Sequence, residues 1–148
     1  MKKIDVKRFV LLGLLLSVSA ICVYAQGKPL IQKVEIPFDF SIGDKTLPAG
    51  AYSVTRVNQE KIMLRLRRDD GRETINIITS TVQAKEAPKT GKLVFRRYGK
   101  TYFLFQIWES DEVQGHQLQR SRAERSFERD LTKIGEEPST VDLAVVTP

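Results

Sequence analysis

Arginine is the residue type whose placement in this chain most clearly suggests chemistry. Five arginines lie in two segments where apolar residues alternate with polar ones, namely Arg65, Arg67, Arg68, Arg96 and Arg97. A guanidinium group donates hydrogen bonds in a planar fork that matches phosphate and carboxylate oxygens. On neighbouring strands these side chains would form a basic sheet face for an anionic partner, such as a lipid headgroup or an acidic polysaccharide. The alternative is that they point outward and are balanced by acids such as Glu73 and Glu109.

Three aromatic side chains near the second arginine pair are the other candidates for ligand contact. Tyr98, Tyr102 and Trp108 have faces that stack on sugar rings, but the same residue types also form the core and rim of a hairpin. Both interpretations stay open at this point. The candidate ligand-binding residues are therefore Arg65, Arg67, Arg96, Tyr98, Tyr102 and Trp108.

His116 is the only histidine, and it lies close to acidic residues in the sequence. Glu112 and His116 are four positions apart, a spacing that on a helix would give a metal-ligand pair or, with Asp111, the centre of a small hydrolase. A metal site normally needs three or four ligands, and Gly115 would interrupt the helix, so we expect His116 to be a solvated loop residue. A Ser-His-Asp arrangement stays open, although no nucleophile-elbow motif supports it. We assign no catalytic residue, no metal ligand and no cofactor.

The first 25 residues have the pattern of a secretory signal peptide. Residues 1–8 carry four basic side chains, residues 9–27 carry no charge, and Val23 and Ala25 place small residues where a signal peptidase cuts, ahead of Gln26. We therefore expect an exported protein, periplasmic or extracellular. The competing hypothesis is that the apolar stretch of about 20 residues stays uncut and anchors the chain in a membrane.

Removal of residues 1–25 changes what the composition implies. The chain of 148 residues has a net charge of +6, and the signal peptide takes four basic residues and one acidic residue, which leaves +3. Half of the basicity belongs to the targeting segment, so no nucleic-acid partner is expected. Cys22, the only cysteine, is also removed, so the exported chain has no disulfide and depends on its core for stability. The length suits one domain, at residues 26–131, followed by a flexible tail at 132–148.

Alternation of apolar and polar residues predicts β-strands through most of this domain. The expected strands lie at residues 34–40, 51–57, 61–68, 73–83, 93–98 and 101–108. Asp69, Asp70 and Gly71 predict a hairpin turn, because these residue types tolerate positive φ angles. We therefore predict a mainly β protein, a small antiparallel sandwich or barrel of about six to seven strands with one C-terminal helix.

The composition after Trp108 favours a helix, which we place at residues 117–130. An apolar stripe at helical spacing, expected to lie against the sheet, is formed by Leu118, Ala123, Phe127 and Leu131. In the tail, residues 141–146 form the expected short edge strand.

Several segments together carry a resemblance to a known family. They are Pro37-Phe38-Asp39-Phe40, Leu47-Pro48-Ala49-Gly50 with Tyr52, Leu93-Val94-Phe95 with Arg97-Tyr98-Gly99, Tyr102-Phe103-Leu104 through Ile107-Trp108, and Ser121-Arg122 with Glu124. In these segments the chain resembles a family of short secreted bacterial proteins known mainly as hypothetical proteins. The resemblance spans residues 34–125 and implies no activity, cofactor or catalytic residue.

The sequence therefore favours an exported, non-enzymatic β domain that acts as a binding or structural protein of the periplasm or cell envelope. Its expected partner is an envelope protein, an anionic glycan or a lipid headgroup, with membrane attachment only through an uncleaved signal segment. One alternative is a small hydrolase or metal-dependent enzyme that uses His116. Another is a lipocalin-like carrier of an apolar ligand, with Phe95, Phe103 and Phe105 lining a cavity.

Overall fold

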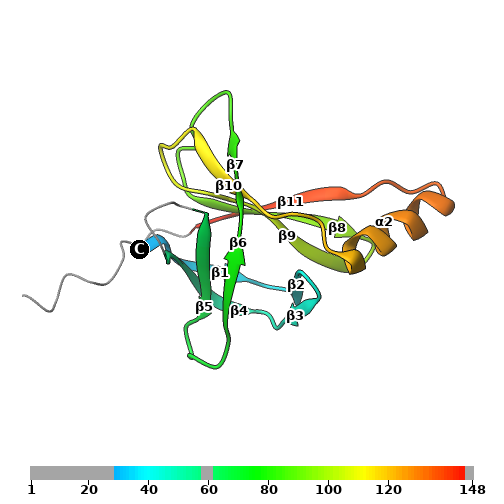
Figure 1. Ribbon diagram of the computed structural model, residues 1–148, viewed down its shortest axis with the longest axis horizontal. Helices are drawn as coiled ribbons and strands as arrows, with labels where there is room; N and C mark the ends of the chain where they lie inside the picture. Colours follow the sequence, from blue (N-terminus) through cyan, green and yellow to red (C-terminus); the bar gives the residue numbers. More distant parts are fainter. Residues whose placement is uncertain (1–28, 58–61, 146–148) are drawn as a thin grey trace, which may run out of the picture.

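The computed structural model describes residues 29–57 and 62–145, which form two β-sheets and a helix (Figure 1). The predicted signal peptide at residues 1–25 lies outside the described residues. In the part of the chain that the structure describes, no helix has the length and apolar composition needed to span a bilayer.

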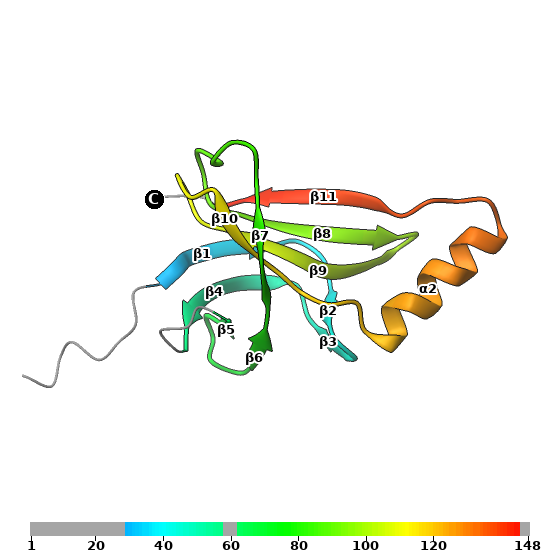
Figure 2. The same cartoon turned by 45° about the horizontal axis from the view of Figure 1, so that its top comes forward.

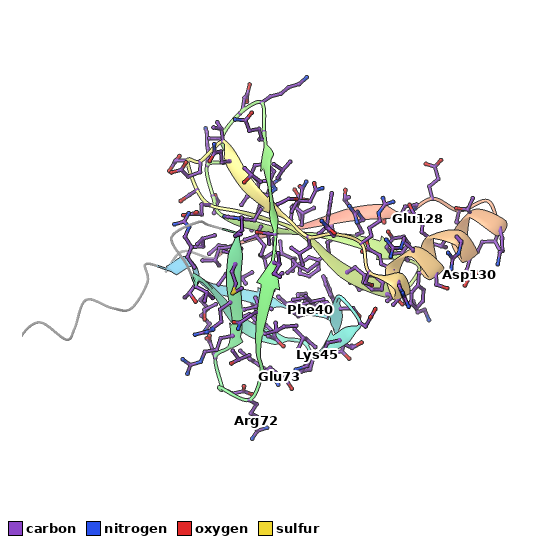
Figure 3. All side chains as sticks on the ribbon, in the orientation of Figure 1. Phe40, Lys45, Arg72, Glu73, Glu128 and Asp130 are labelled. Atoms are coloured by element: carbon purple, nitrogen blue, oxygen red, sulfur yellow. The ribbon has the colours of Figure 1, made fainter. Side chains whose placement is uncertain are left out.

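The first sheet has four antiparallel strands in the order β1-β4-β5-β6. They are β1 (Pro29–Ile36), β4 (Gly50–Arg56), β5 (Met63–Arg68) and β6 (Thr74–Ile78). The turn predicted at residues 69–71 joins β5 to β6, with Gly71 at a φ of 74°. The Asp70 carboxylate accepts the backbone N–H of Arg72, which lies at the tip of this turn (Figure 3). The hairpin prediction is therefore confirmed.

The second sheet has the strand order β11-β8-β9-β10-β7. Its strands are β7 (Ser80–Gln83), β8 (Lys92–Tyr98), β9 (Thr101–Trp108), β10 (Gln114–Gln117) and β11 (Ser139–Ala144). A short hairpin joins it from the side: β2 (Phe40–Ile42) pairs antiparallel with β3 (Lys45–Leu47) and parallel with β9. The predicted hairpin at residues 93–108 is the β8–β9 pair, and Gly99 takes a φ of 60° in its turn.

The segment predicted as one strand at residues 73–83 is two strands that belong to different sheets. β6 pairs with β5, whereas β7 pairs with β10. Thr79 lies between them, is buried, and donates both its backbone N–H and its hydroxyl to the carbonyl of Ile62. Figure 2 shows the chain running from β6 into β7 and so passing from one sheet to the other. This crossing links the two sheets.

The core lies between the two sheets. Large side chains that are at most 1% exposed come from both of them, including Ile36, Tyr52, Val54, Leu64 and Leu66 on one side and Leu93, Phe95 and Ile107 on the other. Phe40 lies between Tyr52 and Phe95, with its ring centroid 5.3 Å and 5.5 Å from theirs, each pair in an edge-to-face arrangement. The prediction of a mainly β fold with one C-terminal helix is confirmed, and the sandwich is the architecture present.

The helix begins later than predicted. α2 (Arg122–Lys133) starts after Ser121, whose hydroxyl accepts the backbone N–H of Glu124 at 3.1 Å as an N-cap. Gln117, the predicted first residue, lies in β10, where it pairs with Gln106 and Ser80. The predicted helix at 117–130 is therefore wrong at its start, because pairing between strands captures these residues.

The chain after the helix returns to the second sheet. β11 pairs with β8 along its whole length, with Val141 opposite Phe95 and Leu143 opposite Leu93. Part of the expected flexible tail at residues 132–148 is thus an ordered edge strand, which begins two residues earlier than the strand predicted at 141–146. Figures 1 and 2 show α2 at one end of the molecule, beyond the β8–β9 turn.

Candidate functional site

An open groove of about 390 Å³ lies where three elements meet at the end of the molecule that carries α2. These elements are the β2–β3 hairpin, the β8–β9 hairpin and the first half of α2 (Figure 2). Its lining residues are Asp39, Phe40, Ser41, Gly43, Asp44, Thr46, Lys100, Thr101, Tyr102, Phe103, Ala123 and Phe127. The groove therefore combines residues from three distant parts of the sequence.

The wall of the groove is aromatic. Phe127 on α2 is 42% exposed, and its ring lies 5.7 Å from the ring of Phe103, which is buried. Tyr102 is half-buried and stacks on Phe38, with ring centroids 3.8 Å apart and an interplanar angle of 15°. Phe40 closes the floor from β2, and Figure 3 shows it between this hairpin and the body of the molecule. This arrangement offers an apolar surface that solvent still reaches.

Polar groups stand along the rim of the groove. Asp44 and Lys100 are exposed in the two hairpin turns that flank it. Asp39 is already engaged, because its Oδ1 accepts the backbone N–H of Ala49 at 2.8 Å. An apolar wall with a few charged groups at the edge is the usual composition of a site that holds an apolar ligand and orients its polar end.

The helix that forms one wall is held by a buried ion pair. Glu124 is 4% exposed, and its Oε1 accepts hydrogen bonds from Arg96 Nη1 at 2.8 Å and from the Tyr98 hydroxyl at 3.1 Å. The Arg96 guanidinium also lies over the Phe105 ring, 3.4 Å from its centroid. Two of the residues predicted to bind a ligand, Arg96 and Tyr98, therefore anchor α2 to β8.

The hydrogen bond between Tyr98 and Glu124 makes the stability of the protein depend on pH. Burial, together with the Glu124 carboxylate, raises the pKa of Tyr98 to about 12, whereas an unfolded chain releases a tyrosine proton at a pKa of about 10. The contribution of Tyr98 to stability is thus complete below about pH 10 and is lost as the pH rises to about 12. We expect the stability difference between the wild-type protein and Tyr98→Phe, measured by denaturant unfolding at several pH values, to fall across this window. A difference that stays constant from about pH 10 to about 12 would contradict the assignment.

The other candidate ligand residues are scattered. Arg65 and Arg67 are exposed on β5 in the first sheet, whereas Tyr102 lines the groove from the second. Trp108 is 6% exposed, and its Nε1 donates to Gln106 Oε1 at 3.1 Å. Its ring lies so close to Gly115 that a Cβ there would be 2.5 Å from it. The six predicted residues therefore do not form one surface, and Trp108 is a packing residue.

His116 is buried on β10, 6% exposed, and not in a loop. Its Nδ1 lies 3.2 Å from the Thr79 hydroxyl in a buried hydrogen bond. The prediction of a solvated loop residue is wrong, because residues 114–117 form a strand between β9 and β7. Across residues 29–57 and 62–145, no group of three or more His, Cys, Asp and Glu side chains is placed to hold a metal ion.

The neighbourhood of His116 is a small polar cavity of about 30 Å³. Glu112 and His116 both line it, Glu112 from the turn before β10 and His116 from β10 itself, and they do not lie on a helix. Glu109, another lining residue, forms an ion pair with Arg56 of β4. This ion pair connects the two sheets.

The three phenylalanines predicted to line a carrier cavity have different surroundings. Phe95 is completely buried in the core, where its ring centroid lies 5.3 Å from that of Phe38 and 5.5 Å from that of Phe40. Phe105 lies under the Arg96 guanidinium, and Phe103 lines the groove. Phe103 is 2% exposed beneath the groove and Phe95 is a core residue, so the three side chains do not line one cavity.

Sequence reasoning identified only part of the groove. Ala123 and Phe127 of the expected helical stripe line the groove, whereas Leu118, expected on the same stripe, lies before the helix begins. The pattern does not show that Phe40 and Tyr102 lie opposite Ala123 and Phe127. The missing information is the pairing of β2 with β9, which a sequence pattern does not report. Comparisons with family models, with curated proteins and with solved structures found no match to this chain.

Proposed function

We propose that this chain is an exported, non-enzymatic binding domain that holds an apolar group in the groove between α2 and the two hairpins. The observation that carries the proposal is the aromatic wall made by the exposed Phe127 and the half-buried Tyr102 in a groove of about 390 Å³. That volume lies in the range of small-ligand sites, which are typically about 300–1,000 Å³. The signal-peptide pattern of residues 1–25 supports export to the periplasm or beyond.

The groove suits binding because its walls are held in place before a ligand arrives. Glu124, which directly follows the groove residue Ala123, anchors α2 to Arg96 and Tyr98. The hydroxyls of Ser41 and Thr46, 3.2 Å apart, link the two strands of the β2–β3 hairpin. A preorganised site loses less conformational entropy on binding, so its contacts contribute more to affinity. The ligand class that fits is an aromatic or aliphatic group with a polar end near Asp44 or Lys100.

A neutral apolar dye tests this proposal. We expect N-phenyl-1-naphthylamine to become fluorescent on binding the protein, and Ala123→Trp, which fills the groove from a half-buried helix position, to weaken dye binding by about tenfold or more. Phe127→Ser, which removes part of the wall, should weaken it by a similar factor. Both are measured by fluorescence titration, with circular dichroism to show that the variants are folded.

Ile134→Ser is the matched control for the dye titration. Ile134 caps the same helix, is 69% exposed and is not among the residues that line the groove. Its substitution should leave dye affinity unchanged. Absence of dye binding by the wild-type protein, or an equal loss in the control, would overturn the proposal.

A further inference from the structure

The outward side of the four-stranded sheet carries a second feature that the groove does not explain. Its side chains lie in rows across the strands, and three of these rows define what we call the outer face. The rows are Val57, Met63 and Ile78, then Thr55, Arg65 and Asn76, then Ser53, Arg67 and Thr74. The face is thus aliphatic along one row and carries an arginine in each of the next two.

The aliphatic row is unusually exposed. Ile78 is 73% exposed and Val57 is 39% exposed, and Met63, which lies between them in the row, is half-buried. Exposed aliphatic side chains are common when single, but a row of them at one end of a sheet is typical of an interaction surface. Because they lie in neighbouring strands, they would enter one apolar layer together.

The two arginines of the outer face are not neutralised within the described chain. Arg65 Nε donates to the neutral Asn76 side chain at 3.0 Å, and no ion pair joins Arg65 or Arg67 to a carboxylate of residues 29–57 or 62–145. The acids of the β5–β6 turn already have partners, because Asp69 pairs with Lys33 and Asp70 pairs with Arg68. Glu35 also points outward, but from edge strand β1, two strands away from β5. The charge of this face therefore matches an anionic partner.

We infer that the outer face docks on an anionic lipid surface. Arg65 and Arg67 would contact headgroup phosphates, while Ile78 and Val57 enter the boundary between headgroups and acyl chains. The aliphatic row favours a bilayer over a polysaccharide, because aromatic rings are the side chains that stack on sugar rings, and the three rows of the outer face contain no aromatic side chain. The inference is independent of the groove, since the two sites share no residue.

Vesicle sedimentation tests the inference. We expect protein purified from the exported fraction to bind vesicles of phosphatidylglycerol and to bind vesicles of phosphatidylcholine much more weakly, with the binding reduced by added salt. Arg65→Gln combined with Arg67→Gln should weaken binding to phosphatidylglycerol by about 30-fold, since each basic group near the surface contributes about a factor of five. Ile78→Ser should weaken it by about fivefold through lost apolar contact.

Arg125→Gln combined with Arg129→Gln is the matched control. Both arginines are exposed on α2, and this double variant lowers the net charge by the same amount as the double variant of Arg65 and Arg67. These changes should leave vesicle binding nearly unaffected.

Binding to dextran sulfate, a soluble polyanion, distinguishes a lipid partner from a soluble one. Because dextran sulfate has no apolar layer for Ile78 to enter, the Ile78→Ser variant should bind it as strongly as the wild-type protein does. Equal sedimentation with both lipids, an equal loss in the control, or undiminished vesicle binding by Ile78→Ser would each overturn the inference. Dye binding in the groove should persist in all these variants, so the two proposals fail separately.

Discussion

Replacing Glu124 with alanine is expected to lower the free energy of unfolding by about 3–5 kcal/mol. The carboxylate is 4% exposed and accepts hydrogen bonds from both Arg96 and Tyr98. Its removal leaves the Arg96 guanidinium, whose side chain is 12% exposed, without its counter-ion in a place where water does not replace it. Urea denaturation followed by circular dichroism measures the change.

Glu128→Ala provides the matched control for this prediction, since Glu128 is another glutamate on α2 that pairs with an arginine. It bonds to Arg120 at 2.8 Å, but the two side chains are 29% and 41% exposed, so we expect a loss of about 1 kcal/mol or less. Figure 3 shows Glu128 on the helix. If both alanine variants lose the same stability, the buried pair does not anchor the helix. If Glu124 does anchor it, its alanine variant should also lose dye binding, because α2 forms a wall of the groove.

Replacing Phe95 with alanine is the second large effect, with an expected loss of about 3–5 kcal/mol in the free energy of unfolding. Phe95 is 0% exposed and makes edge-to-face contacts with both Phe38 and Phe40. Truncation removes the buried apolar surface and leaves a cavity that the surrounding strands cannot fill. Denaturant unfolding measures the loss, with the denaturant slope checked for a change in compactness.

Phe127→Ala separates this core role from a ligand-lining role. Phe127 is 42% exposed, so its truncation should cost about 1 kcal/mol or less in stability while it weakens dye binding. Phe95→Ala should show the opposite pattern, with low stability and with dye affinity retained wherever the variant is folded. A Phe95→Ala protein as stable as the wild-type protein would instead support a carrier with an open interior.

Local patterns in the sequence determined most of the strands. Two short runs rich in aromatic and aliphatic residues, Leu93 to Tyr98 and Thr101 to Trp108, are sufficient to predict a hairpin, because such residues favour strands and Gly99 permits the turn between them. The same holds for β5, β6 and the turn at Gly71. These features depend on residues close together in the chain, so their physical causes are visible in the sequence.

Elements set by distant residues were less predictable. Residues 114–117 have no strong strand pattern, yet they form β10 because β9 and β7 lie on either side and satisfy their backbone groups. Thr79 ends one strand and starts another because the carbonyl of Ile62 accepts two hydrogen bonds from it. Both outcomes depend on pairing with a distant segment, namely β7 for β10 and Ile62 for Thr79.

The arginines show most clearly which features the sequence determines and which depend on the tertiary structure. By residue type and alternation, Arg65, Arg67 and Arg96 are equivalent, and the sequence alone determined only that each lies on a strand. The tertiary structure decided that α2 covers Arg96 with a buried carboxylate, whereas no described element covers Arg65 and Arg67 with an acid. The physical reason is that the net effect of a charge depends on its solvation and its nearest counter-charge, and both are set by the packing of elements that the chain brings together from a distance.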